Sequence, residues 1–355
     1  MVQRHIPWMT KQVWRWCSAL AWLAACGAGP DGASSARKDA ANTDAALAQE
    51  VQDADTADTA AASFVVVNWN VGTVGGVGSD PAAVGFGKQQ KAWSDEHYGN
   101  GLAFLPAVAE AKTWLATHPA DIVAFQEIFD PALCAEIPLE AHVGFVCEGW
   151  QTGMPTVAEQ LVGAGFVVAC HPGKSDKCIA VRQTFASIDG CSGPLCRDAG
   201  FGYPISGCGK GARAARFVLR RPGGEVLHVR HVHGNSGLAD SDKQCRVQLF
   251  QAALTDLEPG RHLVLGDFNT DPVRFAGLDP SADALLALTA SGQPLQFLTE
   301  IGADTPPTYG GLVGIDHVLG VGLQGSCSHA GVSADLPAAS TVGWWDHTPV
   351  RCLLQ

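Results

Sequence analysis

The stretch that decides the fold is HLVLGDFN at residues 262–269, an apolar run that ends in polar side chains. The run 262–265 predicts a buried strand, and Gly266, Asp267 and Asn269 follow directly at its end. In α/β proteins, ligands and catalytic groups collect at such strand ends. The stretch therefore predicts one strand of a sheet together with part of a functional site.

The same arrangement recurs along the chain, where further apolar runs lead into side chains that bind metals or carry protons. These places are Asn68-Trp69-Asn70, Gln126-Glu127, His231-Val232-His233, Ile315-Asp316-His317 and Asp346-His347. Each motif alone is weak evidence for a functional site. Glu127 alone would most often be a surface carboxylate, and His231 alone would most often be a strand histidine with its hydrogen bonds satisfied. Their recurrence in this order makes the pattern specific.

Strands and helices alternate between these places. We expect strands at 64–70, 121–126, 166–169, 213–219, 225–233, 262–265, 315–319 and 348–353, and helices at 102–118, 156–164 and 240–257. The segment 170–210 holds five cysteines and is expected to be rich in loops. Strands, hairpins and helices mixed in this way indicate an α/β fold in which two sheets pack together with helices outside.

Composition limits the class of protein. Of 355 residues, 46% are hydrophobic and 16% are charged, so a large core can form and wholesale disorder is excluded. The chain has no uninterrupted apolar stretch of the length that a membrane span needs, which argues against a multi-span membrane protein. A net charge of −12 argues against a protein that simply coats DNA, but a nuclease with a bound divalent metal stays possible.

The N-terminus predicts export. Residues 1–25 carry Arg4, Lys11 and Arg15, no acidic residue and a short apolar run, as a secretory signal does. The run ends in LAAC at 23–26, which looks like a bacterial lipobox with Cys26 as the lipidated residue; the alternative is an ordinary signal peptide cleaved nearby. Residues 26–62, rich in Ala, Asp, Thr and Ser, are expected to be a flexible linker, and 63–355 the folded domain.

Localisation and cysteine use agree with this interpretation. We expect a lipoprotein of the bacterial cell envelope, in the outer membrane and held there by its N-terminal lipid, with secretion as the alternative. Ten cysteines remain beyond Cys17 and Cys26, and an even set in an exported chain predicts up to five disulfides. Cys170–Cys178 and Cys327–Cys352 are plausible pairs, although the sequence does not fix the pairing. A zinc–thiolate site is disfavoured because the chain has no CxxC pair.

The order of the motifs over 64–355 resembles the endonuclease/exonuclease/phosphatase superfamily, which includes DNase I, the apurinic endonucleases, inositol polyphosphate phosphatases and bacterial sphingomyelinases. The family's WN, QE, GDFN, IDH and DHxPV motifs correspond to 69–70, 126–127, 266–269, 315–317 and 346–350. Trp345 stands where the family usually has Ser. The resemblance implies a DNase I-like four-layer sandwich, with two mixed β-sheets packed together and helices outside, and hydrolysis of a phosphate ester.

The resemblance also implies a metal site. Phosphodiester hydrolysis needs a hard cation on the phosphate oxygens and a deprotonated water in line with the scissile bond. Glu127, Asn70 and Asp346 are the expected metal ligands, with oxygen donors of the kind that Mg²⁺ prefers. Mn²⁺ and Ca²⁺ are the alternative ions.

The remaining motif residues are expected to handle the water and the phosphate. His347 is the predicted general base, and Asp316 would accept its other N–H and fix the tautomer. Asp267 and Asn269 would hold the attacking water and the phosphate.

The pair His231 and His233 leaves a choice open, because their i, i+2 spacing puts both on one face of a strand. The superfamily has one His or Tyr here that acts on the phosphate or the leaving group, and strand alignment favours His231, with His233 as the alternative. A zinc site built on His-x-His is disfavoured because the chain continues with Gly234-Asn235.

The substrate is expected to be a phosphodiester, either a phospholipid or a nucleic acid. Glu127-Ile128-Phe129-Asp130 looks like the ExFD of the sphingomyelinase/phospholipase C branch, and Gly209-Lys210-Gly211 looks like its Lys-Gly element. The prediction therefore leans toward that branch, with an extracellular DNase I-like nuclease as the alternative. A catalytically dead surface binding module is the alternative of another class, and the complete motif set argues against it. We expect a monomer.

Overall fold

The structure is a computed structural model that describes residues 63–73, 84–197 and 199–355. The predicted signal peptide, the lipidation site Cys26 and the linker 26–62 lie outside the described residues.

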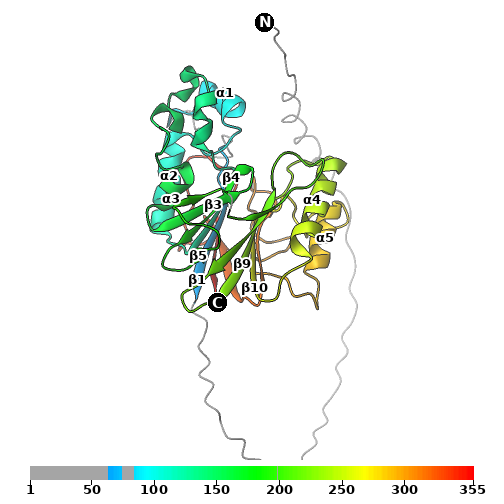
Figure 1. Cartoon of the computed structure of the whole chain (residues 1–355). Coiled ribbons are helices and arrows are strands. Elements are labelled where there is room, and N and C mark those ends of the chain that lie inside the picture. Colours follow the sequence, from blue (N-terminus) through cyan, green and yellow to red (C-terminus); the bar gives the residue numbers. More distant parts are fainter. Residues whose placement is uncertain (1–62, 74–83, 198) are drawn as a thin grey trace, which may run out of the picture. The chain divides into compact units, whose positions relative to one another are not determined.

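Two seven-stranded sheets form the centre of the described domain (Figure 1). The first has the order β13 (Gly325–His329), β14 (Val350–Leu354), β1 (Phe64–Asn70), β2 (Ile122–Gln126), β4 (Lys174–Arg182), β3 (Phe166–His171), β6 (Leu195–Cys196). The second has the order β11 (Gln296–Phe297), β12 (Asp316–Val321), β10 (Arg261–Asp267), β9 (Val226–His233), β8 (Ala214–Arg220), β5 (Ser187–Ile188), and β7 (Phe201–Tyr203) also pairs with β8.

Both sheets are mixed. In the first, β1 runs parallel to β2 and antiparallel to β14. In the second, β10 runs parallel to β9 and antiparallel to β12. The predicted α/β fold with two mixed sheets and helices is confirmed.

The alternation of side chains along each strand explains how the layers pack. Val66 of β1 and Leu263 of β10 point into the core between the sheets, and both are fully buried. Val67 of β1 points the other way, into the core beneath helices α2 (Leu105–Thr117) and α3 (Val157–Val162). Val264 of β10 likewise packs under α4 (Asp240–Leu254) and α5 (Pro280–Leu288). Helices thus cover the outer face of each sheet (Figure 1).

Several elements lie outside the predicted set. Helices α1 (Lys88–His97) and α5, strand β13 and the 3₁₀ turns at Pro131–Glu136, Leu139–His142 and Val146–Glu148 were not expected. The expectation that 170–210 is rich in loops is wrong for its first part, because β4 is a nine-residue strand in the middle of its sheet. Helix α3 ends at Val162, two residues earlier than predicted, and Gly163 follows with a φ of 79°, which suits a residue without a side chain.

All ten cysteines of the folded domain pair. The disulfides are Cys134–Cys147, Cys170–Cys178, Cys191–Cys196, Cys208–Cys245 and Cys327–Cys352. The two pairs considered plausible from the sequence are both present, each joining residues that face each other on neighbouring strands. The described residues contain no helix with the length and apolar character that crossing a membrane requires.

Candidate active site

The predicted site residues meet because inward-facing positions change from apolar to polar along four central strands. The inward positions are Val66, Asn68 and Asn70 on β1; Ile122, Ala124 and Gln126 on β2; Val229, His231 and His233 on β9; and Leu263, Leu265 and Asp267 on β10. Register aligns these ends, since Asn70 pairs with Gln126, and Asp267 pairs with both His233 and Asp316. One end of the inter-sheet core is therefore polar.

Two site residues have a backbone conformation that is uncommon for their type. Glu127 and Asn269 have φ values of 57° and 53°. Asn tolerates this left-handed region, whereas for Glu it costs about 1–2 kcal/mol. The turn brings the Glu127 carboxylate over Gly72, where an added Cβ would lie 2.1 Å from Oε2. Backbone strain at Glu127 is thus part of how the carboxylate reaches the site.

The glycine of GDFN has a packing role. Gly266 has a φ of 150°, and a Cβ built there would lie 1.8 Å from the backbone oxygen of Val232 on β9. Only glycine allows β9 and β10 to approach this closely. The approach places His233 beside Asp267.

Asp267 is the centre of the cluster. Its Oδ1 accepts from the Asn269 amide at 2.8 Å, and its Oδ2 accepts from the side-chain amides of Asn269 at 2.9 Å and Asn70 at 3.1 Å. Asn70 also donates to Glu127 Oε1 at 3.3 Å, and Gly72 N–H donates to Asn70 Oδ1 at 3.0 Å. The Asn70 amide therefore turns its nitrogen toward the carboxylates.

His347 and Asp316 form a hydrogen-bonded pair. His347 Nδ1 donates to Asp316 Oδ2 at 2.8 Å, which leaves Nε2 3.8 Å from Asp267 Oδ2 and 4.0 Å from Asp346 Oδ1. Burial alone would lower the pKa of His347, but the bonded Asp316 carboxylate, with Asp267 and Asp346, raises it to about 10. At neutral pH the metal-free ring is therefore protonated on both nitrogens, with Nδ1 held by Asp316 and Nε2 facing the cluster.

Of the two candidate histidines, the structure brings His233 to the cluster. His233 Nε2 lies 3.5 Å from Glu127 Oε1 and 3.6 Å from Asp267 Oδ2. His231 lies one inward position deeper, is fully buried, and has its Nε2 hydrogen-bonded to Gln126. His233, the alternative candidate, is thus the nearer of the two to the cluster; the i, i+2 rule identifies the shared face but not the depth along the strand.

The carboxylates of the cluster suit a divalent cation. Burial raises the pKa of Glu127, Asp267 and Asp346 above their ordinary values, that of Asp267 to about 7, with the positive charge of His347 opposing the rise in each. Several anions held in so little water are unfavourable, and a bound divalent cation would relieve this. The oxygen donors match Mg²⁺ chemistry.

Ligand atoms of Asp267, Asp316 and His347 also lie within 4.8 Å of one another. However, Asp316 and His347 already bond to each other, so this grouping fits a carboxylate–imidazole pair better than a set of metal ligands. Asn70 offers its oxygen to a cation only if its amide turns away from Gly72 N–H. Glu127 and Asp346 remain the carboxylates best suited to hold the metal.

Sequence reasoning missed Lys177, which lies on the overlooked strand β4 opposite Gln126. Its side chain is 1% exposed and bonds to Asp176 Oδ2 at 2.7 Å, and its charge lowers the pKa of Glu127. Burial lowers the pKa of Lys177 to about 8, against the effect of Asp176. The apolar run 178–181 that follows it was the available signal for a strand.

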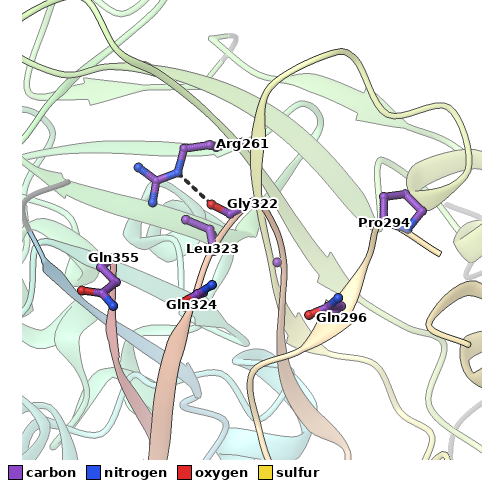
Figure 2. A pocket seen from close by; sticks show the side chains of 8 residues that line it. Arg261, Pro294, Gln296, Gly322, Leu323, Gln324 and Gln355 are labelled. Carbon is purple, nitrogen blue, oxygen red and sulfur yellow. Dashed lines mark hydrogen bonds between the residues drawn. The ribbon is translucent and has the colours of Figure 1, made fainter. Parts of the chain in front are cut away.

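The site is distinct from a cavity of about 600 Å³ at the other end of the strands (Figure 2). That cavity is lined by Arg261, where β10 begins, and by Gln296, Leu323, Gln324 and Gln355, among others. None of the predicted site residues lines it.

Comparison with known proteins found distant similarities to solved structures. Among solved structures, the chain is similar to an endonuclease/exonuclease/phosphatase from Bacteroides vulgatus (11% identity, 83% of this chain and 99% of that one, TM-score 0.48). It is also similar to one from Beutenbergia cavernae (14%, 82% and 71%, TM-score 0.47) and to the human Nocturnin catalytic domain (14%, 82% and 93%, TM-score 0.43). Identities and scores this low carry no substrate across. No curated protein matches the sequence.

The family itself is identified by sequence. The profile of the Endonuclease/Exonuclease/phosphatase family matches residues 67–337, well over half of the chain. Members of this family are hydrolases that act on phosphate esters and typically depend on divalent metals. The matched region contains the strand ends that carry Asn70, Glu127, His233, Asp267 and Asp316. The chain belongs to the endonuclease/exonuclease/phosphatase family.

Proposed function

We propose that the protein is an exported, Mg²⁺-dependent phosphodiesterase that hydrolyses a phosphate ester by in-line attack of water. The observation that carries the proposal is the His347–Asp316 pair, with Nδ1 held by the carboxylate at 2.8 Å and Nε2 directed into the carboxylate cluster. The nearby carboxylates raise the pKa of this imidazole, so a cation bound to them would lower it again and leave Nε2 free to take a proton from water.

The metal would be held by Glu127 and Asp346, with Asn70 joining after its amide turns. When bound, it supplies charge neutralisation of the phosphate oxygens and a lowered pKa of water. Mg²⁺ is proposed because the donors are oxygens, and Mn²⁺ and Ca²⁺ are the ions to compare.

The other residues of the cluster would position the reactants. His347 removes the proton from the attacking water while Asp316 holds the imidazole in place. Asp267 and Asn269 orient the water and the phosphate, and His233 contacts a phosphate oxygen or the leaving group. The complete set of these groups, gathered at one end of the core between the two sheets, argues against a catalytically dead binding module.

For the substrate we propose a choline phospholipid, as in the sphingomyelinase/phospholipase C branch. Three arginines of the basic segment 213–221 support this choice, because each pairs with an acidic residue. Arg216 pairs with Glu258, Arg220 with Asp189, and Arg221 with Glu225. These arginines are poorly placed to follow a polyanion such as DNA or an inositol polyphosphate.

For the location we propose export and attachment to the cell envelope through a lipid on Cys26. Five disulfides support an oxidising compartment. We further propose that the mature protein is a monomer, with residues 26–62 as a linker to the domain.

A substrate panel tests the proposal. Purified protein is assayed on bis-p-nitrophenyl phosphate, sphingomyelin, phosphatidylcholine, inositol phosphates and plasmid DNA, with Mg²⁺, Mn²⁺, Ca²⁺ or chelator. We expect chelator-sensitive release of phosphocholine, with little cleavage of DNA. Preferential cleavage of DNA would replace the lipid assignment by a nuclease, and no hydrolysis of any phosphodiester would overturn the proposal.

The metal assignment has its own variant. Glu127→Gln keeps the size of the side chain but removes a ligand charge, so we expect kcat/KM to fall about a hundredfold or more with the fold intact. Glu140→Gln, at an exposed carboxylate, is the matched control and should leave kcat/KM unchanged. Near-normal turnover of Glu127→Gln at limiting Mg²⁺ would refute the assignment.

A further inference from the structure

A second polar layer lies directly beneath the candidate active site. It consists of Asn68 on β1, Gln126 on β2, His171 on β3 and His231 on β9, all at most 1% exposed. Asn68, Gln126 and His231 stand one or two residues before Asn70, Glu127 and His233 in the sequence. The proposed reaction gives none of these four side chains a task.

Hydrogen bonds join the four side chains into one chain. Asn68 Nδ2 donates to Gly266 O at 3.0 Å, and Gln126 Nε2 donates to Asn68 Oδ1 at 2.9 Å. Gln126 Nε2 also contacts His231 Nε2. His231 Nδ1 lies 3.0 Å from His171 Nε2, and His171 Nδ1 lies 3.1 Å from Ala212 O.

The direction of every bond follows from the two ends, because a carbonyl oxygen only accepts. At one end, Ala212 O requires the proton on His171 Nδ1, so His171 Nε2 accepts from His231 Nδ1. At the other end, Gly266 O requires Asn68 to donate and so to present its oxygen to Gln126. Gln126 therefore presents its nitrogen, which can donate only to an unprotonated His231 Nε2.

This series of hydrogen bonds cannot accommodate a second proton on His231. A hydrogen on His231 Nε2 would face the Gln126 amide nitrogen, and turning that amide would set its oxygen against Asn68 Oδ1. The groups that act on the charge of His231 are His171 on β3 and Lys177 on β4. Burial and both of these neighbours lower the pKa of His231 well below its ordinary value, which agrees with a neutral ring.

This hydrogen-bonded chain crosses between the sheets three times. Asn68 to Gly266 joins β1 to β10, Gln126 to His231 joins β2 to β9, and His231 to His171 joins β9 to β3, in each case from one sheet to the other. The active site above is divided in the same way, with Glu127 following a strand of the first sheet and Asp267 ending a strand of the second. Directional bonds fix a spacing that apolar packing alone specifies less sharply.

We propose that His231 is a positioning residue. Together with Gln126, Asn68 and His171, it sets the spacing of the two sheets beneath Glu127 and Asp267, and it does so only as a neutral imidazole with the proton on Nδ1. This inference rests on the proposed phosphodiesterase for its kinetic consequence. The tautomer is independent of that function.

NMR of protein with ¹⁵N-labelled histidine rings tests the tautomer. His171 and His231 should both be neutral, with the proton on Nδ1, and should not titrate between pH 5.5 and 8. Assignment comes from loss of each signal in His171→Gln and His231→Gln. A His231 ring that carries its proton on Nε2, or that titrates near its ordinary pKa, would overturn the proposal. A wild-type protein that cleaves no phosphodiester would refute the proposed function. The tautomer of His231 would still show whether its hydrogen bonds join the two sheets as proposed.

Kinetics test the positioning role. His231→Leu removes both bonds, and we expect kcat to fall at least about tenfold with KM within about twofold, because misplacement of reacting groups acts on the chemical step. His231→Gln keeps one donor and one acceptor and should recover most of kcat. The matched control is His262→Leu, another fully buried strand histidine, which bonds to Glu258 O at the far end of β10 and should leave kcat unchanged.

Two results would contradict this role. One is a His231→Leu variant with kcat within about twofold of wild type. The other is a His231→Gln variant that is as impaired as His231→Leu. If His231→Leu fails to fold, the comparison of His231→Gln with His262→Leu and the tautomer of the wild-type ring still decide the question.

Discussion

His347 has two nitrogens with different partners, and the proposed chemistry depends on that difference. Nδ1 is committed to Asp316, while Nε2 faces the carboxylate cluster. If the two residues act as a unit, removing either should cost most of what removing both costs. This expectation distinguishes an oriented general base from two separate contacts.

We therefore expect strong non-additivity in a double-mutant cycle. His347→Ala should abolish most activity, and Asp316→Asn should lose much of it because an amide can hold the wrong imidazole tautomer. The double variant should be little worse than His347→Ala in kcat/KM. Losses that simply multiply would mean that the water is activated by another group, and Asp267 would be the next candidate.

The charge on His347 also predicts a pH dependence of stability in metal-free protein. The pKa of His347 is about 10 in the folded chain and about 6.5 in an unfolded one. A raised pKa of a base stabilises the fold fully below the unfolded pKa, and this contribution is lost as pH rises through the folded value. The stability of wild type relative to His347→Gln should thus be constant below about pH 6.5 and decline toward pH 10.

Denaturant unfolding in chelator at a series of pH values measures this difference. The comparison with His347→Gln matters because the pKa of Lys177 is lowered to about 8, which makes that residue contribute in the opposite direction. A difference between the two proteins that does not change from pH 6 to pH 10 would contradict a charged His347 in the metal-free state.

Some residue roles were within reach of sequence reasoning and others were not. The motif order predicted that Asp316 and His347, 31 residues apart, lie together, and the structure places them in contact. It favoured His231 over His233, whereas the structure brings His233 to the cluster; the two share a face and differ only in depth. That depth depends on where β9 stands against Gln126 of the other sheet, which no local pattern records.

At the scale of elements, the same limit appears in β4. The segment Lys174-Ser175-Asp176-Lys177 has the composition of a surface turn, yet the structure places it in a central strand and buries Lys177 beside Asp176. Strands β1, β2, β9 and β10 were predicted to within a few residues because each has apolar residues on its inward face before its polar site residues. The ion pair of the buried Lys177 with the partly exposed Asp176 cancels that signal.

The disulfides allow a prediction about how elements are held. Cys208–Cys245 joins the segment before β8 to α4 across 37 residues, whereas Cys191–Cys196 spans only 5. If each bond acts by restricting the unfolded chain, its loss should cost about 4 and about 2 kcal/mol respectively.

The measurement is the free energy of unfolding of the two double Cys→Ala variants. Loss of Cys208–Cys245 should also reduce activity, because Arg213 donates to Cys208 O and to Gly234 O, and Gly234 O also accepts from Asn269 of the active site. Equal destabilisation by the two variants would indicate that native-state packing, rather than loop length, determines the effect.

At the scale of the whole molecule, charge and attachment bear on which substrates the site can meet. The net charge of −12 opposes approach to anionic polymers and anionic membranes alike. A lipid anchor would place the domain near a bilayer without any favourable electrostatic attraction. Net charge therefore gives no support to a phospholipid substrate. Attachment to a membrane through residues 26–62 would support it, because it would hold the domain close to lipid.

The last prediction concerns that attachment. If Cys26 is lipidated, the Cys26→Ala protein should move from the membrane fraction to the soluble fraction and lose incorporation of labelled fatty acid, because burial of acyl chains supplies the anchor. Cys17→Ala is the matched control, since Cys17 lies in the apolar run of the signal and should be removed with it. Both proteins should keep their specific activity on soluble bis-p-nitrophenyl phosphate, because the catalytic cluster lies in the folded domain. Activity of Cys26→Ala on vesicles of phosphatidylcholine or sphingomyelin should then show whether attachment matters for a lipid substrate. A Cys26→Ala protein that stays in the membrane fraction would refute the lipobox and would require another means of attachment.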